Sequence, residues 1–173
     1  MAVDTEQLRS SCAYVVGDDG LSRWSDTSAE AWIGLLETHR KLSRELDELL
    51  EAQHGIGLSG LEVLGRLASA DDRRLRVSDL AAAAGLSVSR VSRLVDSLQA
   101  RGLVERQRCP GDGRAINAHL TPAGLDLARE AQGSHFAAVQ ERFFDQLAPA
   151  EVAMLAEVFA RFAPQGAGAC SVS

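Results

Sequence analysis

The chain has 173 residues, of which 46% are hydrophobic and 24% are charged, a composition typical of one soluble domain with short extensions. Its longest apolar runs are far shorter than the ~18–20 residues of a membrane-spanning helix, and acidic residues near the N-terminus argue against a secretory signal. Three cysteines without CxxC spacing argue against a disulfide framework or a structural zinc site. We therefore expect a cytoplasmic protein with no membrane partner.

Charge is distributed unevenly along the chain, whose net charge is −6. The segment from Leu58 to Thr121 contains ten arginines and seven acidic residues, whereas the rest of the chain contains eight basic and seventeen acidic residues. A mildly basic segment inside an acidic chain is typical of a local nucleic-acid-binding surface.

The N-terminal third predicts an arm followed by a long helix. Residues 1–26 show little periodicity, and we predict a flexible arm with a short helical piece near residues 5–15. Thr27 and Glu30 then form a capping box, and apolar side chains recur at three- and four-residue steps to about residue 53.

The middle of the chain predicts short helices and then strands. Helices are predicted over residues 59–70, 77–84 and 87–101, with a polar loop at 71–74. Gly102 is a suitable residue to end the last of these helices. The pattern then changes and predicts two strands that are joined by the loop CPGDG, at residues 103–107 and 115–120.

Helical signals return after the second strand. Thr121 and Pro122 are a helix cap followed by proline at the first helical position, and they begin a helix that runs to about residue 146. Pro149 begins a last helix to about residue 163, and the small, polar tail at 164–173 is expected to be disordered.

Residues 77–101 have the pattern of a helix-turn-helix. Alanines allow the first helix to pack closely on the second, Gly85 permits the tight turn, and Leu86 fills the space beneath it. The outer face of the second helix displays short hydroxyls and arginines, which suit phosphates and base edges in a major groove. These side chains are Ser87, Ser89, Arg90, Ser92 and Arg93. A β-hairpin directly after such a helix makes the unit winged.

This segment resembles the winged helix-turn-helix of the MarR family of bacterial transcriptional regulators. The run LAAAAGLSVSRVSRLVDSLQARGLVERQRCPGDGRA and the following INAHLTPAG carry the resemblance, which extends over roughly residues 28–162. Asp112-Gly113-Arg114 matches the family's Asp-x-Arg in the wing, and Leu120, Thr121 and Gly124 match its Leu-Thr-x-x-Gly. The resemblance implies that Arg114 enters the minor groove, that Asp112 braces the wing, and that a ligand or an oxidant releases the protein from DNA.

The flanking helices predict a homodimer independently of the resemblance to the MarR family. They carry more apolar residues than a small winged domain covers, including all five phenylalanines of the chain, so a symmetric dimer is the simplest way to bury them. A two-fold dimer places two recognition helices about 10 bp apart, or a multiple of that, on a pseudo-palindromic operator.

The predicted fold class is mainly α with a small β-hairpin wing. The predicted organisation is an arm (1–26), an N-terminal dimerisation helix (27–57), a DNA-binding lobe (58–121), C-terminal dimerisation helices (122–163) and a tail (164–173).

The cysteines and histidines have simpler structural interpretations than a redox or metal site. A thiol beside arginines could act as a redox switch in the wing, but we interpret Cys109 as a small residue at a strand end. Cys12 and Cys170 lie in the predicted arm and tail and have no basic cluster nearby. The four histidines show neither HxxxH nor HxH spacing, so we expect packed or interfacial histidines and no metal.

The resemblance also implies an effector pocket between the dimer helices and the DNA-binding lobe. The effector that the family implies is an aromatic or otherwise lipophilic small molecule. The residues that could line such a pocket are Trp32, Leu35, His39, Leu64 and Arg66.

Together these patterns predict a sequence-specific regulator of transcription that binds double-stranded DNA and, as a repressor, is released by a small-molecule effector. No Gly-rich phosphate loop, GxSxG or HExxH motif is present, so we expect no enzymatic activity and no cofactor. Two alternatives stay open: a cysteine-based redox-sensing regulator of the same fold, and a winged-helix protein-interaction module. The second would not need Ser89, Arg90, Arg93 and Arg114 together.

Overall fold

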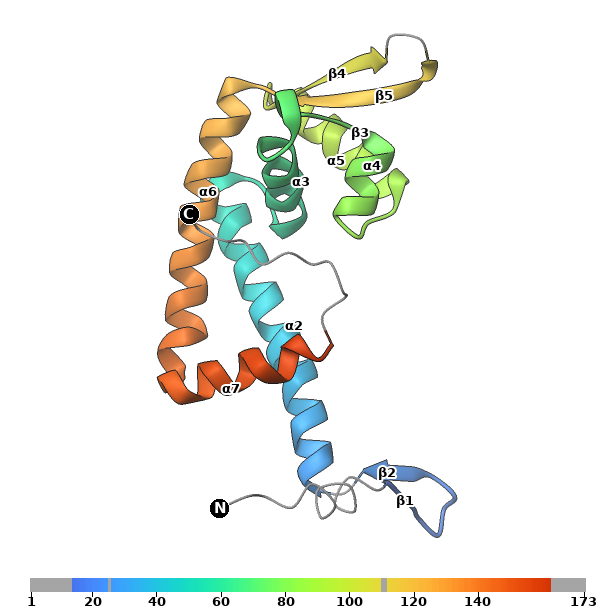
Figure 1. Ribbon diagram of the computed structural model, residues 1–173, viewed down its shortest axis with the longest axis vertical. Coiled ribbons are helices and arrows are strands. Elements are labelled where there is room, and N and C mark those ends of the chain that lie inside the picture. Colours follow the sequence, from blue (N-terminus) through green and yellow to red (C-terminus); the bar gives the residue numbers. More distant parts are fainter. Residues whose placement is uncertain (1–13, 25, 110–111, 163–173) are drawn as a thin grey trace. The chain divides into compact units, whose positions relative to one another are not determined.

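The computed structural model describes residues 14–24, 26–109 and 112–162, without the side chains of Asp26, Cys109 and residues 112–115. The chain divides into two compact units, Met1–Glu48 and Leu49–Ser173 (Figure 1). None of the described helices combines the length and apolar character that a membrane crossing requires.

The first unit contains a small hairpin that was not expected. Strands β1 (Tyr14–Val16) and β2 (Ser22–Trp24) pair antiparallel, and the rings of Tyr14 and Trp24 meet edge to face, with centroids 6.1 Å apart. The predicted helical piece near residues 5–15 is therefore wrong at its last two residues, and its residues 5–13 lie outside the described residues. The physical reason is that the valines favour extended backbone and the following GDDG stretch supplies a turn.

Helix α2 (Asp26–His54) begins in the first unit and ends in the second, and it confirms the long helix predicted from residue 27 to about residue 53. In the first unit three of its large apolar side chains are exposed, which are Trp32, Ile33 and Leu35. In the second unit the same helix contributes Leu50, which is fully buried in the core.

The second unit holds the rest of the fold. Its small sheet is antiparallel with strand order β3-β5-β4, so a third strand joins the predicted hairpin. The prediction of a loop at 71–74 missed this strand, because three residues carry no alternation that marks a strand. The elements are α3 (Leu58–Ala68), η1 (Asp71–Arg73), β3 (Arg74–Arg76), α4 (Val77–Ala83), α5 (Val88–Ala100), β4 (Val104–Cys109), β5 (Asp112–Leu120), α6 (Pro122–Arg142), η2 (Phe144–Gln146) and α7 (Pro149–Ala160).

One hydrophobic core joins these elements. Side chains from α3, α4, α5, the sheet and α6 meet in it, and most are completely shielded from water. The largest fully buried side chains of the core are Leu50, Leu64, Leu67, Leu80 and Leu120. Burial on this scale outweighs the loss of chain entropy, so the winged lobe has a core that can hold its surface elements in fixed positions.

The starts of two helices confirm the predicted caps at Ser87 and Thr121, whereas the predicted cap at Thr27 is wrong, because α2 already begins at Asp26. The Ser87 hydroxyl accepts a hydrogen bond from the backbone N–H of Arg90 at the start of α5. The Thr121 hydroxyl accepts from the N–H of Gly124 at the start of α6 and donates to the carbonyl of Gly102. These bonds satisfy donors that a helix start otherwise leaves unpaired.

Candidate nucleic-acid interface

Helices α4 and α5 form the helix-turn-helix that the sequence predicts. Gly85 adopts φ +64° between them, and the N–H of Leu86 donates to the carbonyl of Ala81 at 3.0 Å, which closes the turn. On α5, Val91 and Val95 are completely buried against the core. The opposite face of α5 is consequently turned to solvent.

The N-terminus of α5 presents a group of hydroxyls. Ser87 and Ser89 share a hydrogen bond of 3.2 Å, and both side chains are exposed. The first N–H groups of a helix have no partner within the helix and attract anions. A phosphate is an anion that this end of α5 is suited to receive.

The two predicted arginines on α5 have different surroundings. The Arg90 guanidinium donates to the Ser59 hydroxyl on α3 at 2.9 Å, in an exposed contact that water weakens. The Arg93 side chain is exposed, and its guanidinium makes no hydrogen bond or ion pair within the described part of the chain. Of the two, Arg93 is the one whose charge points to solvent without a partner.

Ser92 differs from the prediction. Its side chain is only half exposed, and its hydroxyl accepts a hydrogen bond of 2.6 Å from Arg106 on β4. The predicted set of outward-facing hydroxyls therefore divides into two that are exposed at the helix start and one that contacts the wing.

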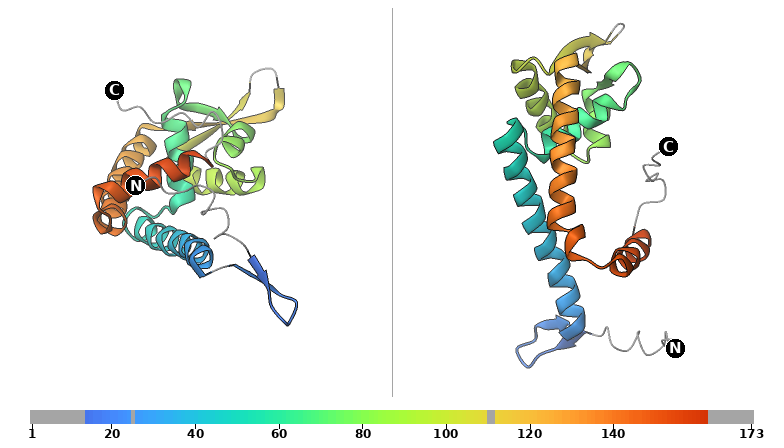
Figure 2. Two further views of the ribbon diagram at one scale, coloured as in Figure 1. Left: turned by 60° about the horizontal axis from the view of Figure 1, so that its bottom comes forward. Right: turned by 90° about the vertical axis from the view of Figure 1, so that its left-hand side faces the viewer.

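The wing is formed by β4 and β5, which project from the lobe that holds α4 and α5 (Figures 1 and 2). Their register runs from Val104 opposite Leu120 to Arg108 opposite Ile116, with an irregularity before Cys109. The predicted loop at 109–113 is therefore too long, since β4 includes Cys109, β5 begins at Asp112, and these two residues pair with each other. The backbone places Arg114 in β5, and the side chains of Cys109, Asp112 and Arg114 lie outside those described.

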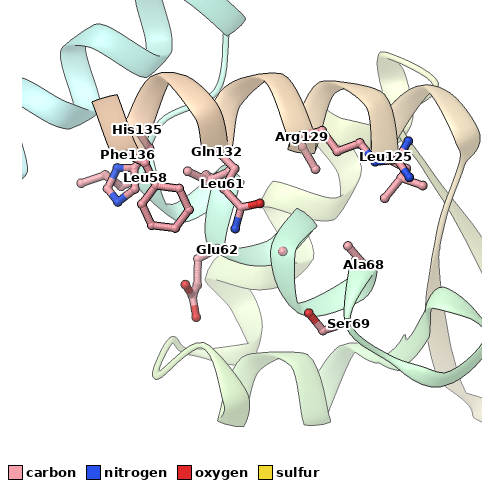
Figure 3. Close-up of a pocket in the computed structure, with 12 residues that line it drawn as sticks. Leu58, Leu61, Glu62, Ala68, Ser69, Leu125, Arg129, Gln132, His135 and Phe136 are labelled. Atoms are coloured by element: carbon pink, nitrogen blue, oxygen red, sulfur yellow. The ribbon is translucent and has the colours of Figure 1, made fainter. Parts of the chain in front are cut away.

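A second feature of this unit is a hollow between α3 and α6, with a volume of about 300 Å³ (Figure 3). Leu58 and Leu61 of α3 border it on one side, and Leu125, Gln132 and Phe136 of α6 border it on the other. Its lining is thus mixed, with leucines, alanines and Phe136 beside several polar side chains, which are Glu62, Ser69, Arg129, Gln132 and His135.

His135 also borders this hollow. Its Nδ1 atom is buried and has no hydrogen-bond partner within the described chain, and burial lowers the pKa of its imidazole. A neutral imidazole offers one donor and one acceptor, so His135 is a polar group that a bound molecule could satisfy.

The residues predicted to line an effector pocket do not border this hollow. Leu64 is completely buried in the core, and Arg66 is exposed and paired with Glu62 at 2.8 Å. Trp32, Leu35 and His39 belong to the first unit, and their role stays a prediction. The lining of α3 follows a second stripe, Leu58, Leu61, Gly65 and Ala68, whose helical spacing is visible in the sequence.

In the part of the chain that the structure describes, the histidines do not gather with other possible metal ligands. His54 shares a hydrogen bond of 2.9 Å with the Ser134 hydroxyl on α6. Within the described ranges, no three His, Cys, Asp or Glu side chains gather closely enough to hold a metal ion.

Comparison with known proteins identifies the family. AbsC, a MarR family transcriptional regulator from Streptomyces coelicolor, is 33% identical with a TM-score of 0.72, and the match covers 81% of this chain and 95% of AbsC. Sco3205, a MarR family regulator from the same organism solved in complex with DNA, is 32% identical with a TM-score of 0.74, covering 85% of this chain and 96% of Sco3205. This chain belongs to the MarR family.

Two further matches agree with this assignment to the MarR family. The family profile of MarR matches residues 54–115, which run from the end of α2 into the wing. The transcriptional repressor MprA of Escherichia coli K12 is 32% identical over 90 residues, which is 52% of this chain and only 51% of MprA. The predicted fold class, mainly α with a winged helix-turn-helix, is confirmed.

Proposed function

We propose that this MarR-family regulator binds double-stranded DNA sequence-specifically as a homodimer, with α5 in the major groove and the wing in the adjacent minor groove. The observation that carries the proposal is the exposed start of α5, where the hydroxyls of Ser87 and Ser89 and the guanidinium of Arg93 stand on one helix beside the wing. Phosphates are held by such groups, and guanine edges by arginine. The complex of Sco3205 with DNA supports the same use of this fold.

Arg114 is proposed to reach the minor groove from β5, with Asp112 as its brace. The family's Asp-x-Arg pattern supports these roles, and the backbone puts both residues in the hairpin that projects from the lobe. Ser87, Ser89, Arg90 and Arg93 are proposed to contact the major-groove side of the site.

Repression and its release are the finer part of the proposal. The similarity to MprA, a transcriptional repressor, supports repression. We place the effector in the hollow between α3 and α6, because it joins apolar side chains to the unsatisfied Nδ1 atom of His135, as sites for small molecules do. The redox alternative would depend on Cys109.

The test of DNA binding starts from a random library of duplexes, from which wild-type protein selects its own site. Arg114→Ala and Arg93→Ala should each bind the selected duplex about tenfold more weakly, because a base or phosphate contact is lost. If Arg93 contacts a phosphate, its variant should also make the negative slope of log K against log salt shallower by about 0.9. Gel-shift titration over a series of KCl concentrations measures both.

Arg129→Ala is the matched control, since Arg129 is an exposed arginine of α6 that pairs with Asp126 on its own helix. It should leave DNA binding unchanged. Wild-type protein that enriches no sequence, or arginine variants that all bind as wild type does, would favour the protein-interaction module instead.

A further inference from the structure

Arg106 on β4 connects the wing to the recognition helix α5. Its Nη2 donates to the Ser92 hydroxyl at 2.6 Å and lies 3.4 Å from the Ser92 carbonyl, and its Nη1 pairs with Asp96 at 3.2 Å. Ser92 and Asp96 stand one helical turn apart, on the flank of α5 that faces β4. One guanidinium thus holds two side chains of a different element.

This contact differs from the two arginine pairs that lie within helices α3 and α6 of the same unit. Arg66 and Arg129 pair with acids three or four residues away on their own helices, and half or more of each arginine side chain is exposed. The Arg106 side chain is 23% exposed and bridges residues far apart in the sequence. Such a part-buried, two-partner contact is screened less by water and salt than a surface pair.

Apolar packing between the start of α5 and the sheet is incomplete beside Arg106. A hollow of about 230 Å³ lies between the start of α5 and the sheet, and Val88 and Ile116 border it together with Arg106. Both of these apolar side chains are partly exposed. The core packs α5 on the base of the sheet, and the bonds from Arg106 add a connection beside this hollow, where apolar packing is incomplete.

We propose that Arg106 is a positioning residue, which sets the recognition helix at a fixed distance from the wing and does not itself contact DNA. The inference rests on the proposed DNA-binding function. Its outer nitrogens are engaged by Ser92 and Asp96, and its Nε is buried. A helix in the major groove and a wing in the next minor groove must be separated as the grooves are, so a fixed separation favours binding.

Asp96 gives the bridge a second purpose. It is an exposed carboxylate on the helix that approaches phosphates, and its charge would repel them. The guanidinium of Arg106 neutralises that charge from the side of the wing. Arg106 therefore aids binding without offering its own charge to the DNA.

The test uses a charge-balanced pair of substitutions, Arg106→Gln with Asp96→Asn, which removes the bridge and leaves the net charge unchanged. On the duplex selected by wild-type protein, affinity should fall about tenfold while the slope of log K against log salt stays that of wild type. If Arg106 contacted a phosphate, the slope of the double variant would instead be shallower than that of wild type by about 0.9. That result, or wild-type affinity in the double variant, would overturn the proposal.

Two further variants separate positioning from general damage. Ser92→Ala removes one acceptor, keeps every charge and leaves the core intact, so it should weaken binding several-fold at an unchanged salt slope. Arg106→Lys keeps the charge but offers a single ammonium in place of a two-pronged group, so it should bind between wild type and the double variant. Equal binding by Ser92→Ala and wild type would contradict the bridge even if the double variant failed to fold.

Hydrogen exchange of the free protein tests the bridge without DNA. The amides of β4 and of the first half of α5 should exchange faster in Ser92→Ala and in the double variant than in wild type, and those of α6 should not. Unchanged exchange at β4 and α5 would overturn the positioning role. If wild-type protein selected no duplex, this measurement would still decide the bridge, and only the DNA-binding proposal would fail.

Discussion

At the scale of single residues, the close packing around Gly124 explains why the chain has glycine just after the start of α6. A Cβ at this position would lie 2.0 Å from the carbonyl oxygen of Leu103 and 2.8 Å from a methyl group of Leu120. The Thr121 N–H donates to the same Leu103 carbonyl at 3.1 Å, so the helix start is drawn onto the end of the sheet. The requirement is close approach of two backbones, not an unusual φ.

Gly124→Ala should therefore lower the free energy of unfolding by about 2–3 kcal/mol, because the added methyl forces backbone apart. Gly133 on the same helix is the control, since its Cβ would meet no atom within 4 Å. Gly133→Ala should be neutral or stabilise by about 0.5–1 kcal/mol, because alanine is the better helix former. Urea unfolding of the two variants measures the difference, and equal effects would refute this account of Gly124.

At the scale of elements, three arginines connect α5 to its neighbours. Arg90 reaches α3 and Arg106 reaches across from the wing, while Arg101 at the end of α5 donates to the carbonyls of His54 and Gly55 at 2.9 and 2.6 Å. These carbonyls end α2 and have no partner within that helix, so Arg101 acts as a cap supplied by another element. The recognition helix is thereby connected at its start, its flank and its end.

Elements whose signal is local could be predicted from the sequence. The helices and the caps at Ser87 and Thr121 follow from spacing and side-chain chemistry that neighbouring residues carry. Strand β3 could not, because three residues become a strand only through pairing with β5, as where Leu75 meets Ala118. The same holds for the site, since a periodic pattern identifies the outer face of α5 but not that Arg106 reaches Ser92.

The hollow between α3 and α6 is a property of two elements together, and it can be tested by filling it. Gly65 borders the hollow, and a Cβ there would meet no atom within 4 Å. Gly65→Leu should therefore fold at least as stably as wild type, because leucine is the better helix former, and should occupy the space. Compounds that raise the melting temperature of wild type in a thermal-shift screen should not raise that of Gly65→Leu.

Gly133→Leu is the control for that substitution, because it adds the same side chain at a glycine of α6 whose Cβ would meet no atom within 4 Å and which does not border the hollow. It should keep the response to the same compounds. A compound that stabilises wild type and Gly65→Leu equally would place the effector elsewhere, with the predicted residues of the first unit as the next site to test.

At the scale of the whole molecule, a chain of net charge −6 has to approach DNA with a small basic surface. The ten arginines between Leu58 and Thr121 do not all contribute, because several are engaged within the protein. Arg66 pairs with Glu62, and Arg106 pairs with Asp96. The side chains left to meet phosphates are few, so two copies acting together on one duplex would add affinity that one copy lacks.

The exposed apolar side chains of α6 and α7 predict that second copy. Phe136, Met154 and Phe159 are 62%, 60% and 46% exposed, which a lone soluble protein rarely tolerates over neighbouring helices. Phe159→Glu should weaken self-association about 30-fold or more, since it removes a large apolar contact and buries a charge. Sedimentation velocity over a range of concentrations should show a dimer for wild type and a monomer for the variant. Glu157→Gln on the same helix should remain a dimer, and a dimeric Phe159→Glu would exclude this face of α7 from the interface.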